Sequence, residues 1–467
     1  MPAPGCACQA GKARHGSFGG YAAGVYVDTL RGYDVSVNFT TSRRADSTSL
    51  AALALACSLA AATPAIAQDL GAADAGQGIT MMAGALGRYS MMRDGSGTSW
   101  QPDSAPMQGL NWQSGDWTGM VHGYADVVYD RQTGPRGDSE TFSESMLMAM
   151  AQHAEGPGTL TLRAMLSLDP AMGPAGYPLL LQTGETADGT TPLIDRQHPH
   201  NLFMELAGSW SLPVGPDTST FVYFGYPGEP ALGPVTFMHR FSGMDDPAAP
   251  ITHHWLDSAH ITFGVVTAGF IHGNWKVEGS AFNGREPDQH RWGFDALQLD
   301  SWSGRISFNP TDDWALQASY GDLKSPEQLT PEVDQHRITA SATYNRPLFG
   351  GNWQTTLAWG RNDDHPGNVL DGFLVESAFG VGPHTIFARA ESAQKDELFA
   401  PPSPLDGQVF RVGEASVGYI YDIPIRRHVA LGLGAEGAVN FVPAAIKAAY
   451  GGSHPLGYMP FVRLKLR

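Results

Sequence analysis

The chain has 467 residues and a formal charge of −17, from 29 lysines and arginines against 46 aspartates and glutamates. This acidic balance argues against nucleic acid as a partner, because phosphate binding needs a basic surface. Cations and neutral solutes are more natural ligands. An alternative is that acidic loops simply keep the protein soluble and apart from its neighbours.

Residues 43–67 have the organisation of a secretory signal peptide. Two arginines open the segment, and the apolar stretch that follows, 50–62, is too short to span a bilayer. The small-residue motif Ala65-Ile66-Ala67 then marks a cleavage site. We therefore expect export and cleavage after this motif, and we interpret residues 1–42 as an over-extended start.

The exported chain is expected to contain no cysteine. All three cysteines, Cys6, Cys8 and Cys57, precede the cleavage site, so the fold needs no disulfide in an oxidising periplasm. Removal of residues 1–67 takes away five basic and three acidic residues, which leaves 24 lysines and arginines against 43 aspartates and glutamates.

From Trp117 onward the chain alternates apolar and polar residues. Residues 159–168 read Thr-Leu-Thr-Leu-Arg-Ala-Met-Leu-Ser-Leu, which gives one apolar and one polar face on a strand. We find no helical period of useful length. The alternation predicts an all-β fold, a transmembrane antiparallel up-and-down β-barrel of about 16 strands over residues 117–467. The expected strands are 117–129, 143–153, 159–168, 202–212, 219–226, 260–270, 274–283, 301–309, 314–320, 336–345, 353–360, 372–381, 385–391, 409–423, 428–441 and 456–467.

The connections between these strands alternate in length. Short turns such as 155–158 and 310–313 alternate with long loops such as 169–201 and 227–259, as in bacterial outer-membrane barrels. Aromatic residues stand near strand ends, where interfacial girdles need them. Residues 458–467 resemble the C-terminal assembly signal of outer-membrane proteins, although they end on Leu466-Arg467 instead of an aromatic residue. The expected location is the bacterial outer membrane.

Residues 68–116 differ from the rest of the exported chain. They are rich in Gly, Ser, Asp and Met and do not alternate. We expect an irregular N-terminal extension that lies either in the periplasm or inside the lumen.

A stripe of methionine and histidine is predicted on the lumen face of the first three strands. Its members are Met120, His122, Met146, Met148, Met150 and Met165. Thioethers favour Cu(I), and imidazole extends this preference to Cu(II) and Zn, so the stripe is a candidate path or store for copper-type ions. The alternative is that flexible methionine fills gaps where the N-terminal segment plugs the barrel.

Two long loops carry a second set of candidate metal ligands. These are His198 and His200, two residues apart, and His253, His254, Asp257 and His260. Borderline divalent ions accept such nitrogen and oxygen donors. The alternative is a hydrogen-bonded loop plug in which His and Asp stabilise turns.

Four arginines, at 163, 305, 337 and 389, are predicted on polar strand faces together with Glu376 and Glu391. They could form transverse charge pairs across a diffusion channel. The alternative is that they pair to brace an enclosed barrel.

A lipid-directed hydrolase is an alternative function. Ser258 lies near His254, Asp257 and His260 and has the residue types of a nucleophile set. Ser280 with Asn283-Gly284-Arg285 faintly resembles the end of the outer-membrane phospholipase A motif. That motif requires a histidine where this chain has Glu278, so no catalytic residue is assigned.

Three segments resemble a group of uncharacterised, porin-like Gram-negative outer-membrane proteins that accompany copper and heavy-metal resistance systems. These segments are 194–200 with 205–207, 250–258 and 282–288. The resemblance implies a metal-linked role and no catalytic one. The expected function is a porin-like channel or binding barrel for small solutes, with copper-type ions as preferred cargo. A metal-sensing barrel without an open pore is the other alternative.

No cofactor is assigned apart from copper ions. The expected partners are outer-membrane lipid, small solutes or metal ions, the barrel-assembly machinery and further copies of the chain.

Overall fold

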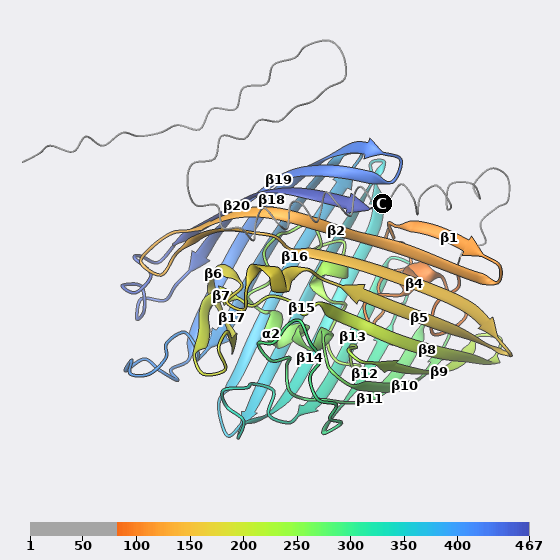
Figure 1. Ribbon diagram of the computed structural model, residues 1–467, viewed down its shortest axis with the longest axis horizontal. Helices are drawn as coiled ribbons and strands as arrows, with labels where there is room; N and C mark the ends of the chain where they lie inside the picture. The colour runs from red at the N-terminus through yellow and green to blue at the C-terminus, as the bar shows by residue number, and fades with distance from the viewer. Residues whose placement is uncertain (1–81, 467) are drawn as a thin grey trace, which may run out of the picture. The chain divides into compact units, whose positions relative to one another are not determined.

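The computed structural model describes residues 82–466, so the predicted start region and signal peptide lie outside the described residues (Figure 1). The strands are β1 (Leu110–Ser114), β2 (Trp117–Gln132), β3 (Ser139–Phe142), β4 (Ser145–Glu155), β5 (Gly158–Leu166), β6 (Tyr177–Thr186), β7 (Pro192–Gln197), β8 (Phe203–Gly215), β9 (Thr218–Gly225), β10 (Val265–His272), β11 (Trp275–Phe282), β12 (Ser301–Phe308), β13 (Trp314–Leu323), β14 (Asp334–Leu348), β15 (Gly351–His365), β16 (Val369–Val381), β17 (His384–Lys395), β18 (Phe410–Arg426), β19 (Val429–Phe441) and β20 (Leu456–Leu466). The short helices are η1 (Met91–Arg93), η2 (Asp169–Met172), η3 (Phe237–His239), α2 (His253–Leu256) and η4 (Ser258–His260).

Sixteen of these strands form a closed antiparallel barrel. Each barrel strand pairs with the next along the chain, and the barrel closes where β2 pairs with β20. The short strands β1 and β3 extend the two edges of β2 beyond its partners β20 and β4. No helix within residues 82–466 is long and apolar enough to cross a bilayer. The predicted barrel of about 16 strands is confirmed.

The outer face of the barrel is apolar. On β4, Leu147 is exposed while its neighbours Met146 and Met148 are buried toward the lumen, as the alternation predicted. Aromatic rings gather at the short-turn end, where Trp275 stacks on Phe308 with ring centroids 4.0 Å apart. A closed sheet leaves no unpaired edge in lipid, and an apolar exterior with interfacial aromatics suits the bilayer. The chain is therefore a bacterial outer-membrane β-barrel.

Two local predictions are wrong. The strand expected over 260–270 begins at Val265, because His260 ends the short helix η4 and Gly264 has a φ of +110°. The loop expected over 169–201 contains the hairpin β6–β7, which forms a separate two-stranded sheet and is not one of the barrel strands. All ten residues of β6 are buried, so this strand shows no alternation that a sequence pattern could reveal.

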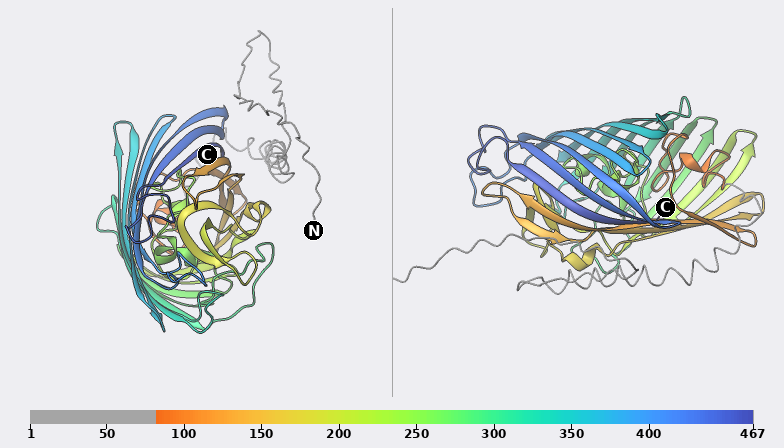
Figure 2. Two further views of the ribbon diagram at one scale, coloured as in Figure 1. Left: turned by 90° about the vertical axis from the view of Figure 1, so that its left-hand side faces the viewer. Right: turned by 90° about the horizontal axis from the view of Figure 1, so that it is seen from above.

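The lumen is largely filled by the chain itself. Residues 82–109 lie inside, where Arg305 Nη2 donates to Thr98 Oγ1 (2.9 Å) and Asn309 Nδ2 donates to the Gln101 carbonyl (2.9 Å). The left view of Figure 2 shows green and yellow segments of the loops within the ring of strands. The described part of the N-terminal extension thus lies in the lumen.

Residues 226–264, here called the lumen loop, are held to the wall by buried ion pairs and hydrogen bonds. Arg240 Nε lies 2.6 Å from Glu376 Oε1, and Arg389 Nη1 donates to the Ala248 carbonyl (2.8 Å). Glu391 accepts from the backbone N–H of Thr252 (2.9 Å). The predicted lumen arginines and glutamates therefore brace the inward segments instead of facing one another across open water.

Candidate metal sites in the barrel lumen

The predicted methionine stripe is brought together by strand register. Met120 lies opposite Met150, and His122 lies opposite Met148, in the pairing of β2 with β4. Met148 in turn lies opposite Met165 on β5. Because partners in register share a face, these side chains all point into the lumen. Met120 is near the start of β2, so this group lies toward the short-turn end of the barrel.

A cavity of about 100 Å³, here called the methionine cavity, adjoins this stripe. Its sulfur and imidazole lining consists of Met107, Met120, His122, Met146, Met148, Met150, Met238, His239 and Met244. The N-terminal segment, the barrel wall and the lumen loop all contribute. Four of these residues are not part of the predicted stripe, because only folding of the inward segments brings them to it: Met107, Met238, His239 and Met244.

Two imidazoles in this region contact thioether sulfurs. His122 Nε2 is 3.3 Å from Met148 Sδ, and His239 Nε2 is 3.3 Å from Met165 Sδ. Burial lowers the pKa of His239 to about 3, with a smaller contribution from His122. The His239 ring is therefore neutral at physiological pH, and a neutral imidazole is the metal-binding form.

The five predicted loop histidines form one buried row. Ring centroids are 5.7 Å apart for His198 and His254, 5.6 Å for His254 and His253, 5.2 Å for His253 and His260, and 5.4 Å for His260 and His200. The structure thus brings together residues from two loops more than 50 positions apart in the sequence.

Asp257 lies beside this row and orients it. Its carboxylate is 2.7 Å from His253 Nδ1 and 2.8 Å from Arg240 Nη1, and its carbonyl is 2.9 Å from His260 Nδ1. Asp169 Oδ2 is likewise 2.8 Å from His200 Nδ1. These partners fix the ring orientation, as outer partners of metal-binding histidines commonly do.

His254 faces two carboxylates that the sequence analysis did not include among the candidate ligands. Its Nδ1 is 3.6 Å from Glu286 Oε2 and 3.7 Å from Glu327 Oε1, and one ligand atom of each residue lies within 4.8 Å of the others. Burial opposes protonation of His254, but the two carboxylates outweigh it and raise the pKa of the ring. No local sequence pattern links these three positions, since each follows a different strand.

A second carboxylate–histidine group, also missed, lies near the long-loop end of β14 and β15. His336 pairs in register with Asp363, and its ring is 4.6 Å from that of His365. Asp363, His336 and His365 each offer a ligand atom within 4.8 Å of the others. All three side chains are partly or fully exposed, so water competes at this group.

The two serines of the hydrolase alternative have partners other than histidine. Ser258 Oγ accepts from Arg337 Nη1 (2.8 Å). Ser280 Oγ lies 2.7 Å from Thr267 Oγ1 and accepts from the backbone N–H of Ala231 (2.8 Å). Within residues 82–466 neither hydroxyl has a hydrogen bond to an imidazole, so the nucleophile–base contact of a hydrolase is missing at both positions.

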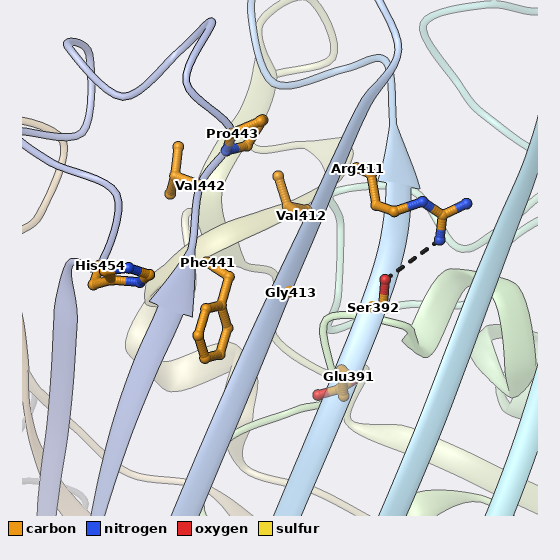
Figure 3. A pocket seen from close by; sticks show the side chains of 9 residues that line it. All are labelled: Glu391, Ser392, Arg411, Val412, Gly413, Phe441, Val442, Pro443 and His454. Carbon is orange, nitrogen blue, oxygen red and sulfur yellow. Dashed lines mark hydrogen bonds between the residues drawn. The ribbon is translucent and has the colours of Figure 1, made fainter.

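A larger hollow of about 400 Å³ lies between β17, β18 and β19 near the long-loop end (Figure 3). Arg411 Nη1 donates to Ser392 Oγ across it (3.4 Å). Its lining includes Glu391, which holds the lumen loop, and a single histidine, His454. This lining provides no set of converging metal ligands.

Glu229, at the start of the lumen loop, gives the barrel a predicted pH dependence. Burial raises the pKa of this carboxyl from 4.5 to about 7, against the opposing charge of Arg305. The folded state therefore retains a proton that the unfolded chain releases, so this stabilisation is present at acidic pH and is lost as pH rises through 7. Between pH 4 and pH 8 we expect the wild type to lose roughly 3 kcal/mol of unfolding free energy relative to Glu229→Gln. Urea unfolding followed by tryptophan fluorescence would measure this difference, and a difference independent of pH would contradict it.

No protein-family model and no curated protein matches the chain. Among solved structures, it is similar to OmpF from Salmonella typhi in a complex with daunomycin (TM-score 0.48, 9% identity, covering 76% of this chain and 100% of that chain). It is also similar to OprB from Pseudomonas putida, with a TM-score of 0.46 and 9% identity over 75% of this chain and 94% of that chain. An anion-selective porin from Comamonas acidovorans has a TM-score of 0.45 and 10% identity over 75% of this chain and 100% of that chain. These likenesses concern the barrel architecture, and no role is carried from them to the side chains of the lumen.

Proposed function

We propose that this outer-membrane barrel binds soft, copper-type metal ions in its lumen and passes them between its two openings. The observation that carries the proposal is the methionine cavity, which places seven methionines and two histidines around about 100 Å³. Thioether sulfur is a soft ligand that selects Cu(I) over hard cations. The cavity is also larger than the volume of one water molecule, about 30 Å³, so an ion fits within it.

Methionine used only to fill gaps would not need imidazole partners. Here His122 and His239 each direct a ring nitrogen to a sulfur at 3.3 Å, and their ring centroids are 6.1 Å apart. The two pairs bring nitrogen and sulfur donors from the wall and from the lumen loop to one place. This mixed donor set supports binding of a soft cation.

The filled lumen favours a second candidate, a barrel that binds or senses such ions without passing them. Reconstitution separates the two candidates. Vesicles that contain the purified protein and an internal Ag(I) indicator are expected to respond to external Ag(I) if the barrel is a conduit. Vesicles that remain silent, with protein that binds Ag(I) in detergent, would favour the sensing barrel.

Binding is tested with Ag(I), a stable substitute for Cu(I). Met→Leu substitutions conserve volume and cost little stability, so the triple variant Met120→Leu/Met148→Leu/Met150→Leu is expected to fold. We expect it to bind Ag(I) at least about tenfold more weakly than wild type in isothermal titration calorimetry, because sulfur ligands are lost.

The matched control is Met459→Leu. Met459 is buried on β20 and does not line the methionine cavity. It is expected to keep wild-type affinity. If the triple variant also keeps it, the methionine cavity is not the binding site.

A further inference from the structure

A different set of metal ligands lies nearer the long-loop end of the lumen. His254 belongs to α2, Glu286 follows β11, and Glu327 lies between β13 and β14. We propose that these three side chains form a binding site for one divalent transition-metal cation, such as Zn²⁺ or Cu²⁺, separate from the methionine cavity. Borderline cations of this kind accept mixed imidazole and carboxylate ligands, which Cu(I) does not favour.

The two carboxylates have no cationic side chain paired to them except the imidazole. Within residues 82–466, no lysine or arginine nitrogen lies within 4.0 Å of either carboxylate. Arg285 and Arg337 are on neighbouring segments, but their hydrogen bonds go to Ser325 and to Ser258 and Gln335. Burying carboxylates without a close counter-charge is costly, and a bound cation would remove that cost.

Ligand atoms at this site also lack hydrogen-bond partners. His254 is 7% exposed and Glu286 is 9% exposed, yet His254 Nε2 and Glu286 Oε1 have no partner. Buried polar atoms are nearly always satisfied in folded proteins, so two unpartnered atoms within one group of three side chains indicate a missing ligand. The other side-chain atoms of the same two residues, His254 Nδ1 and Glu286 Oε2, lie 3.6 Å apart.

The backbone around His254 holds the ring in place. Gly184 on β6 has a φ of +108°, and a Cβ there would lie 2.5 Å from His254 Cε1. Because Gly184 has no side chain, the backbone of the β6–β7 hairpin packs directly against the imidazole. The His254 carbonyl also accepts from Asn362 Nδ2 (3.2 Å). A ring fixed in this way is preorganised for binding, since little freedom remains to be lost.

Three protein ligands leave part of the coordination shell to water. Closed structural zinc sites use four protein ligands, whereas open sites use three. The proposed site is therefore an exchangeable one. It does not depend on the proposed soft-ion function, because its ligands are not those of the methionine cavity.

The test measures Zn²⁺ affinity of the exported chain in detergent by competition with a chromophoric chelator. All variants carry His336→Ala, so that the exposed group at His336, Asp363 and His365 does not contribute. We expect one Zn²⁺ per chain, and at least about tenfold weaker binding in Glu286→Gln/Glu327→Gln. Glu332→Gln, an exposed glutamate in the same loop as Glu327, is the matched control and is expected to bind as its parent does.

A second readout covers the case in which the double variant does not fold. Glu327 is less buried than Glu286, with 23% of its side chain exposed, so Glu327→Gln alone is expected to fold and to alter the visible absorption of bound Co²⁺. Unchanged Zn²⁺ affinity and Co²⁺ spectrum in the glutamine variants, or no Zn²⁺ binding by the parent chain, would overturn the proposal. The glutamine variants are expected to keep Ag(I) binding, and the triple methionine variant is expected to keep Zn²⁺ binding. Failure of one proposal is therefore distinguishable from failure of the other.

Discussion

Replacing Arg463 with methionine is expected to lower the free energy of barrel unfolding by about 3–5 kcal/mol, the usual cost of breaking a buried ion pair. Arg463 lies on the last strand, β20, and its Nε is 2.7 Å from Asp126 Oδ1 on the first barrel strand, β2. Its Nη1 also donates to the Met244 carbonyl of the lumen loop (2.7 Å). Without the guanidinium, the Asp126 carboxylate, which is 1% exposed, loses its counter-charge at the seam where the barrel closes.

Two variants establish the cause of this loss. Arg463→Met/Asp126→Leu removes both buried charges and is expected to recover most of the stability. Arg361→Met breaks an arginine–aspartate pair between β15 and β16, where the arginine side chain is 42% exposed, and is expected to cost far less stability because water screens an exposed pair. Urea unfolding in lipid vesicles measures all three. Equal losses for Arg463→Met and Arg361→Met would show that the seam does not depend on this pair.

The barrel could be predicted from the sequence because its determinants are local. The two-residue alternation is set by neighbours along one strand, so the lumen-facing positions of Met146, Met148 and Met150 follow from the pattern alone. Register then follows from a short turn where one joins two strands, as the turn between β4 and β5 places Met148 opposite Met165.

The interior of the barrel could not be predicted in the same way. Contacts such as that between His239 and Met165 join the lumen loop to β5, 74 positions away, and no periodicity encodes them. Glu286 and Glu327 meet His254 only after three separate loops fold inward. The hairpin β6–β7 was missed because a fully buried strand has no alternating face. Only the residues carried by a strand or by one short motif were therefore predictable: five of the nine sulfur and imidazole residues of the methionine cavity, and His254 alone of the three at the carboxylate site.

Deleting residues 82–109 is expected to raise the ion conductance of the barrel several-fold in planar bilayers. These residues precede β1 and belong to no barrel strand, so their removal leaves the wall intact. Arg305 and Lys276, which donate to Thr98 in the full chain, keep Glu278 as a partner, at 2.9 and 3.0 Å. A sixteen-stranded barrel is wide enough for an aqueous channel once its lumen is cleared.

The lumen loop still occupies part of the interior in this variant, because its anchor Arg240 is paired with Glu376 and Asp257, not with the deleted segment. The expected result is therefore a partial opening, below that of an empty barrel. Deletion of 403–407, which lie in an exposed loop between β17 and β18, removes chain without clearing the lumen and serves as the control. If both deletions leave the conductance at the wild-type level, the lumen loop alone closes the passage. If both raise it equally, the N-terminal segment is not the obstruction.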